Sequence, residues 1–177
     1  MLSDVECRAL AEDYLLRIAQ RWGEELVLLP TPFETSATFA YFYNTPEFLA
    51  TGNYIYALAG NAPIMVSKVT GEIKEAGTAL PTEHYARAFE ACGDPFGTPT
   101  EKVKIFAWSS GANKVRATQV VKEKSEVGLS QAKAVIDNAL SNEESFFTAR
   151  TVEHAEQAVV ELRESGFDSV QLWRNQG

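Results

Sequence analysis

Cysteine, histidine and long apolar runs are scarce in this chain of 177 residues. Two cysteines, Cys7 and Cys92, are too few for a disulfide scaffold and suit a reducing compartment. The two histidines, His84 and His154, fall in different halves, and no Cys-x-x-Cys or His-x-x-x-His spacing occurs, so we expect no metal site. No apolar run approaches the ~18 residues that a membrane-spanning helix requires, so no membrane association is expected.

Basic residues are also fewer than acidic residues. Sixteen Lys and Arg face 24 Asp and Glu, which gives a net charge of −8 at pH 7. Such a surface repels phosphate backbones, so the composition argues against nucleic-acid binding. The first ten residues, MLSDVECRAL, hold two acidic residues before position 7 and lack the basic-then-apolar pattern of a signal peptide. We therefore expect a cytoplasmic protein.

The residues needed for catalysis are missing or badly spaced. Cys92 and His84 lie eight residues apart on one expected helix, roughly 12 Å at 1.5 Å per residue, beyond hydrogen-bond reach. The loop 109–114 lacks the Gly-Lys-Ser/Thr ending with which nucleotide-binding loops hold phosphate and Mg²⁺. The sequence therefore predicts no enzyme activity and no cofactor.

The chain is expected to form two small α+β domains. Two prolines and two glycines interrupt residues 93–100, and the charge changes at the same place. Residues 1–100 hold six Lys or Arg against thirteen Asp or Glu, a net charge of −7, whereas residues 101–177 hold ten against eleven. We predict a first domain at 1–94, a linker at 95–101 and a second domain at 102–177.

The first half has the pattern of a helix, antiparallel strands and a second helix. Ser3 and Glu6 have capping-box spacing, and apolar residues then recur at helical steps as far as Trp22. Short runs at 25–29, 38–43, 64–68 and 72–75 indicate strands, the last two joined by a turn containing Gly71. Pro81 is typical of a helix start.

Five segments of this half occur in a characteristic order: Tyr41–Asn44, Thr51-Gly52, Leu58–Ile64, Thr70–Glu72 and Gly77–Ala79. In these segments residues 4–92 resemble the immunity protein 35 (YrhB-like) family of bacterial polymorphic-toxin systems. The resemblance implies an immunity protein that binds and neutralises one cognate toxin. The acidic charge suits a basic toxin in a 1:1 complex, because opposite charges steer association.

Aromatic residues are the candidate binding residues of this half. We name Tyr41, Tyr43, Tyr54, Tyr56 and the neighbouring Glu47 as candidates for partner binding, because aromatic side chains often anchor interfaces. Core packing is the open alternative, since alternation along a strand always buries one face.

The second half has the order strand, helix, helix, strand, helix, strand. With Gly111–Val115, Val121-Lys122, Gly128-Leu129, Ala132-Lys133 and an Ala-rich helix at 152–165, residues 102–173 resemble the C-terminal domain of the ribosomal large-subunit stalk protein. In that family the first two helices recruit translational GTPases. The resemblance therefore implies a partner-binding surface at Val115, Gln119, Lys122 and Lys133, although Thr118 and Gln119 depart from the family's residues.

Two other functions stay open. The immunity protein 35 family includes a small protein described as a chaperone, so the chain is alternatively a chaperone for unfolded proteins. The stalk-like half suggests instead an adaptor that binds translation factors.

Overall fold

Six α-helices and three antiparallel sheets lie within residues 1–176, which the structure, a computed structural model, describes. The predicted α+β class is therefore confirmed. The described chain separates into two compact units: unit 1 contains Met1–Gly97 together with Asn175 and Gln176, and unit 2 contains Thr98–Arg174. Each unit is described by itself below.

Unit 1 begins with helix α1 (Asp4–Trp22), which starts where the capping box predicts. The Glu6 amide donates to Ser3 Oγ (3.4 Å), and the Ser3 amide donates to Glu6 Oε2 (2.8 Å). Both bonds satisfy backbone donors that the first helical turn leaves open. Gly23 ends the helix with φ of 71°, a conformation that glycine adopts without strain.

A four-stranded sheet forms the middle layer of unit 1, in the order β2 (Phe33–Glu34), β3 (Thr38–Tyr41), β5 (Ile64–Ser67) and β6 (Ile73–Glu75). Phe39, Tyr41, Ile64 and Val66 belong to a core cluster with the apolar stripe of α1. Alternate residues, Ala40 and Met65, pack instead with helix α3 (Thr82–Cys92). Both faces of the sheet are therefore covered, and all four residues of β3 are buried.

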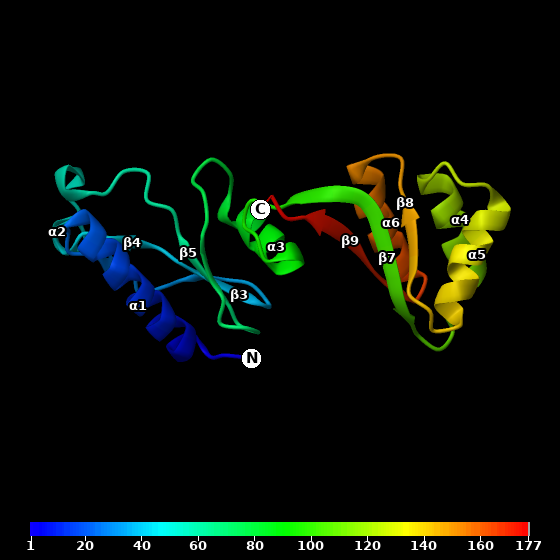
Figure 1. The fold of residues 1–177 in the computed structure, drawn as a ribbon, viewed down its shortest axis with the longest axis horizontal. Helices are drawn as coiled ribbons and strands as arrows, with labels where there is room; N and C mark the ends of the chain where they lie inside the picture. Colours follow the sequence, from blue (N-terminus) through cyan, green and yellow to red (C-terminus); the bar gives the residue numbers. More distant parts are fainter. Residues whose placement is uncertain (177) are drawn as a thin grey trace. The chain divides into compact units, whose positions relative to one another are not determined.

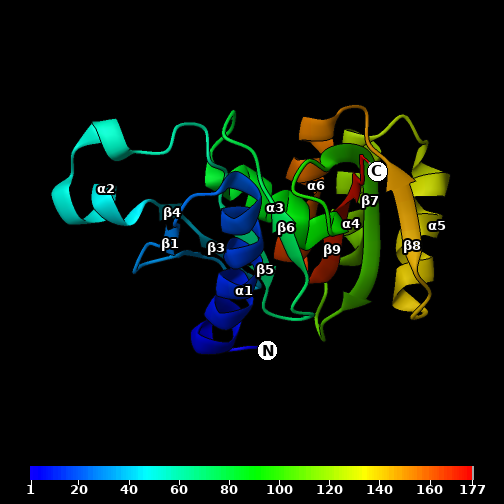
Figure 2. The ribbon, with the colours of Figure 1, turned by 60° about the vertical axis from the view of Figure 1, so that its left-hand side comes forward.

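The predicted strand at 38–43 is divided in the structure. After β3 the chain continues into β4 (Tyr43–Asn44), which pairs with β1 (Val27–Leu28) in a separate two-stranded sheet. Between β4 and β5 lie a short helix, α2 (Pro46–Thr51), and a 3₁₀ helix, η1 (Tyr54–Tyr56), neither of which periodicity predicts. Figure 2 shows this segment, in cyan and green, extending away from the sheet of unit 1.

Unit 2 has the element order that its sequence predicts: β7 (Thr98–Trp108), α4 (Lys114–Lys124), α5 (Leu129–Leu140), β8 (Ser145–Thr148), α6 (Val152–Glu164) and β9 (Phe167–Arg174). The strands form an antiparallel sheet in the order β8-β7-β9, with the three helices packed beside it (Figure 1). Val103, Ile105, Phe147 and Phe167 join the helices in one core. Phe106 and Phe146 lie on the other face, each 50% exposed.

One local expectation for the second half is wrong. Residues 98–101, expected in a linker, form the start of β7, where Thr98 pairs with Arg174 and Pro99 with Trp173. An irregularity in register between Pro99 and Val103 accommodates the proline, which cannot donate to the ladder. In α4 the Val115 side chain is 79% exposed, because the helix buries Ala117, Thr118, Val120 and Val121 instead.

Among the described residues no helix is both long and apolar enough to cross a membrane.

Candidate functional site

The most exposed aromatic surface of unit 1 is the segment of residues 46–56, which contains α2 and η1 and which we call the aromatic lobe. Neither of its helices has a buried residue. Tyr54 is 84% exposed, Ile55 79% and Tyr56 48%. Large apolar side chains at such exposure bury little of their surface in the folded chain, so the lobe is suited to contact another molecule.

Hydrogen bonds at the base of the aromatic lobe join its two ends. Thr45 Oγ1 accepts from the Phe48 amide (3.2 Å) and donates to the Tyr56 carbonyl (2.6 Å). Asn44 Oδ1 accepts from the Thr45 and Leu58 amides, each at 2.9 Å. These bonds join the two ends of the segment, as in an Ω-loop. A surface ordered before binding loses less entropy when a partner docks.

The structure separates the predicted site residues of unit 1. Glu47, Tyr54 and Tyr56 lie on the exposed lobe, as expected for binding residues. Tyr41 and Tyr43, at 0% and 3% exposure, cannot touch a partner, so their assignment to partner binding is wrong. The Tyr41 hydroxyl donates to Asp4 Oδ1 (2.9 Å) beneath α1, and the Tyr43 ring lies 6.4 Å from that of Trp22. Both tyrosines are core residues.

Burial changes the acidity of these two side chains. It raises the pKa of Tyr41 well above its usual range, and the hydrogen bond to Asp4 adds to the effect. Burial also raises the pKa of Tyr43 to about 12, with a smaller contribution from the Glu75 carboxylate. Cys7 lies on the buried face of α1, and burial raises the pKa of its thiol. A thiol that resists ionisation is a poor nucleophile.

The predicted residues of unit 2 come together in one place. Val115, Gln119, Lys122 and Lys133 line a groove of about 410 Å³ between α4 and α5, which we call the α4–α5 groove. Its apolar centre is formed by Val115 and by Leu129, which is 60% exposed. Lysines lie around this centre, so the groove combines apolar contact with positive charge.

Sequence reasoning missed several residues of these surfaces. Leu129 and Lys114 line the α4–α5 groove beside the predicted four, and Ile55 is exposed between the two predicted tyrosines of the lobe. An isolated isoleucine between tyrosines in a segment without strand alternation is the signal that could have identified Ile55. Leu129 belongs to the Gly128-Leu129 segment of the stalk-like resemblance, but the sequence pattern does not indicate that its side chain is exposed.

No group of three or more His, Cys, Asp and Glu side chains within residues 1–176 is arranged to hold a metal ion.

Comparison with known proteins gives one partial similarity. A protein of Escherichia coli K12, described as uncharacterized protein YrhB, is 45% identical over 60 residues, which are 33% of this chain and 64% of YrhB. The chain therefore spans just under two thirds of the length of this curated relative. No family model and no solved structure matches the chain. The YrhB-like resemblance of the first half is thus supported, and the stalk-like resemblance of the second half stays a prediction.

Proposed function

We propose that the protein is an immunity protein, which binds a cognate toxin and neutralises it by direct contact without any catalytic step. The observation that carries this proposal is the aromatic lobe: a hydrogen-bonded segment with an exposed Tyr54-Ile55-Tyr56 face and no buried residue in its helices. Inhibition needs only a complementary surface, and exposed aromatic side chains at a preordered site are typical anchors of tight interfaces.

The charge of the first half favours a basic toxin. With six basic against thirteen acidic residues in positions 1–100, the field around unit 1 attracts a positively charged protein and speeds its association. We propose a 1:1 complex formed in the cytosol, where both free thiols, Cys7 and Cys92, would stay reduced. Toxins that act there on nucleic acids, nucleotides or proteins are the expected partners.

A second candidate function rests on the α4–α5 groove. An apolar centre of Val115 and Leu129 with lysines around it suits an acidic segment that carries apolar side chains. An adaptor that recruits translation factors would use such a groove. The groove is equally compatible with a second contact to the toxin, so experiment must separate the two functions.

The test is a toxin-challenge assay with the product of the gene immediately upstream. Cells that produce this toxin should survive when the protein is co-expressed, and the purified pair should form a 1:1 complex by light scattering. The double variant Tyr54→Ala, Ile55→Ala should weaken the complex at least about tenfold, as expected for loss of two anchors. Val5→Ala with Val160→Ala removes exposed apolar side chains elsewhere and should have no effect.

Other outcomes would identify the alternatives. Suppression of aggregation of unrelated, heat-denatured proteins without protection from the toxin would indicate a chaperone. Capture of ribosomal GTPases that depends on Lys122 and Lys133 would indicate an adaptor. Either result, together with cell death in the challenge assay, would contradict the immunity proposal.

A further inference from the structure

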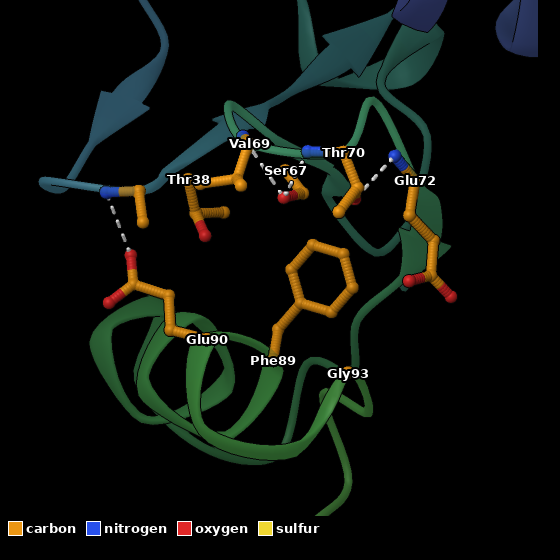
Figure 3. Close-up of a pocket in the computed structure, with 9 residues that line it drawn as sticks. Thr38, Ser67, Val69, Thr70, Glu72, Phe89, Glu90 and Gly93 are labelled. Atoms are coloured by element: carbon orange, nitrogen blue, oxygen red, sulfur yellow. Dashed lines mark hydrogen bonds between the residues drawn. The ribbon is translucent and has the colours of Figure 1, made fainter. Parts of the chain in front are cut away.

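A pocket of about 300 Å³ in unit 1 lies between the N-terminal part of β3, the β5–β6 hairpin turn and helix α3 (Figure 3). We call it the α3 pocket. Its lining comes from three separate segments of the chain: Ala37 and Thr38 before and in β3, Ser67, Val69, Thr70 and Glu72 around the turn, and Phe89, Glu90 and Gly93 at the end of α3. Neither the aromatic lobe nor the α4–α5 groove contributes to it.

Two carboxylates lie at opposite sides of the α3 pocket, and none of its lining residues is basic (Figure 3). Glu90 is held in place because its Oε1 accepts from the Ala37 amide (3.2 Å) and from the Thr35 hydroxyl. Glu72 lies 3.6 Å from Lys74 in a pair whose side chains are both 48% exposed. Exposed pairs of this kind are weak, so Glu72 can exchange this partner for a cation in the pocket.

Thr38 gives an independent indication of a ligand. Its side chain is 1% exposed, and its Oγ1 has no hydrogen-bond partner. Figure 3 shows this hydroxyl directed into the space between Glu90 and Phe89. Buried hydroxyl groups nearly always have a partner in native proteins, because an unpaired one is costly. A donor group in the pocket would supply the missing bond.

The shape of the pocket favours a guanidinium group over an ammonium group. The Phe89 ring lies between the two carboxylates (Figure 3), and because it is only 4% exposed it forms an apolar wall of the pocket. A guanidinium is planar and carries five donors that can reach two separate carboxylates at once, whereas an ammonium is a compact point charge. A volume of about 300 Å³ is at the lower limit for small-molecule sites, and one long side chain occupies such a space.

We propose that the α3 pocket binds an arginine side chain of the protein partner, with Glu72 and Glu90 as charge partners, Phe89 as an apolar wall and Thr38 as a further acceptor. This inference rests on the proposed function in that the arginine belongs to the toxin. The arginine pocket would be a specific contribution to partner binding, in addition to the aromatic lobe and the overall acidic charge.

The probe is a capped arginine, Nα-acetyl-arginine amide, titrated into the full-length protein and followed by NMR. Nα-acetyl-citrulline amide is the matched control, because it has nearly the same shape without the charge. We expect saturable shifts of the Thr38, Phe89 and Gly93 amides with the arginine compound and none with citrulline. Equal binding of citrulline or of capped lysine, or shifts confined to other residues, would overturn the proposal.

Variants assign the binding to this pocket. Glu72→Gln and Glu90→Gln should each weaken capped-arginine binding by about tenfold, since each removes a charge-assisted bond but keeps an acceptor. Glu83→Gln, an equal charge change on the first turn of α3, should have little effect. A loss with Glu83→Gln as large as with the two pocket variants would show that only the overall charge matters, and would overturn the proposal.

Thr38→Val separates a binding role from a structural one. Because Thr38 Oγ1 has no partner in the folded chain, the variant should keep or raise the thermal unfolding midpoint while it weakens arginine binding. A lower midpoint with unchanged binding would exclude Thr38 from the site.

The toxin-challenge assay is a separate measurement. Protection without capped-arginine binding would leave the immunity function standing and refute the arginine pocket. Arginine binding without protection would support the pocket and refute the immunity function.

Discussion

Two tyrosines of unit 1 that lie eleven residues apart have opposite environments. Tyr43 is 3% exposed and Tyr54 is 84% exposed, although both are aromatic residues in the stretch that carries the family resemblance. The difference determines what each residue contributes: Tyr43 stabilises the fold, and Tyr54 is available to a partner. Because Tyr43 is buried, its contribution to folding stability also depends on pH.

Replacement of Tyr43 by phenylalanine should flatten the alkaline stability profile. The pKa of Tyr43 is raised to about 12 in the folded protein, whereas an unfolded tyrosine has a pKa of about 10. Above pH 10 the unfolded state releases a proton that the folded state keeps, so stability falls as pH rises from 10 to 12. The limiting slope is about 1.4 kcal/mol per pH unit for this proton.

Urea unfolding at pH 8, 10, 11 and 12 measures this effect. The wild-type free energy of unfolding should fall more steeply than that of Tyr43→Phe across this range, and the two curves should run parallel below pH 9. Tyr54→Phe alters an exposed ring and serves as the control. Identical slopes for Tyr43→Phe and wild type would contradict the assignment.

At the scale of elements, the aromatic lobe depends on a few polar residues at its base. Thr45 Oγ1 takes part in two of its hydrogen bonds. Thr45→Val keeps the shape of the side chain but leaves the Phe48 amide and the Tyr56 carbonyl without this partner. We expect a loss of about 1–2 kcal/mol, confined to the lobe.

Hydrogen exchange detects such local loosening. Amides of residues 46–56 should exchange faster in Thr45→Val than in wild type, whereas amides of β3 and β5 should be unchanged. Thr148→Val, at an exposed position of β8, is the control. Uniformly faster exchange throughout unit 1 would show that Thr45 supports the whole fold.

The α4–α5 groove gives a prediction about association. The double charge reversal Lys122→Glu, Lys133→Glu should change the free energy of unfolding by no more than about 0.5 kcal/mol per site, because both side chains are on the surface. If the groove contacts the partner, association should slow and its salt dependence should change. Stopped-flow kinetics can measure the association rate of this variant. The double variant Lys102→Glu, Arg174→Glu is the matched control, because it changes the charge by the same amount outside the groove. Unchanged rates would remove the groove from the interface.

Sequence reasoning succeeds where the signal is local. Ser3 and Glu6 identify the start of α1, and Gly71 identifies the turn between β5 and β6. It fails for α2, because a six-residue helix contains too few turns for a periodic pattern. It also leaves Tyr41 undecided, since alternation predicts one buried face, whereas α1 and α3 cover both faces of this sheet.

The candidate sites follow the same rule. Val115, Gln119, Lys122 and Lys133 lie together because α4 and α5 are adjacent in sequence and pack against each other. The α3 pocket could not be predicted, because Thr38, Glu72 and Phe89 come from distant segments and meet only in the tertiary structure.

At the scale of the whole molecule, the chain consists of two separate units, with a boundary at Gly97 and Thr98. Each unit has its own buried core. We therefore expect fragments 1–97 and 98–174 each to fold when expressed alone, and calorimetry should show a cooperative transition for each. Absence of a cooperative transition in both fragments would refute the division.

The first and last residues of unit 2 are direct partners in one sheet, Thr98 opposite Arg174. Hydrogen bonds of an antiparallel ladder lie perpendicular to the strands. A force applied through the two ends of the unit therefore breaks the bonds between β7 and β9 one after another. Such a geometry resists pulling weakly, whatever the thermal stability. We therefore expect unit 2 to unfold at a lower force when it is pulled through these two ends than when β7 is pulled along the direction of β9.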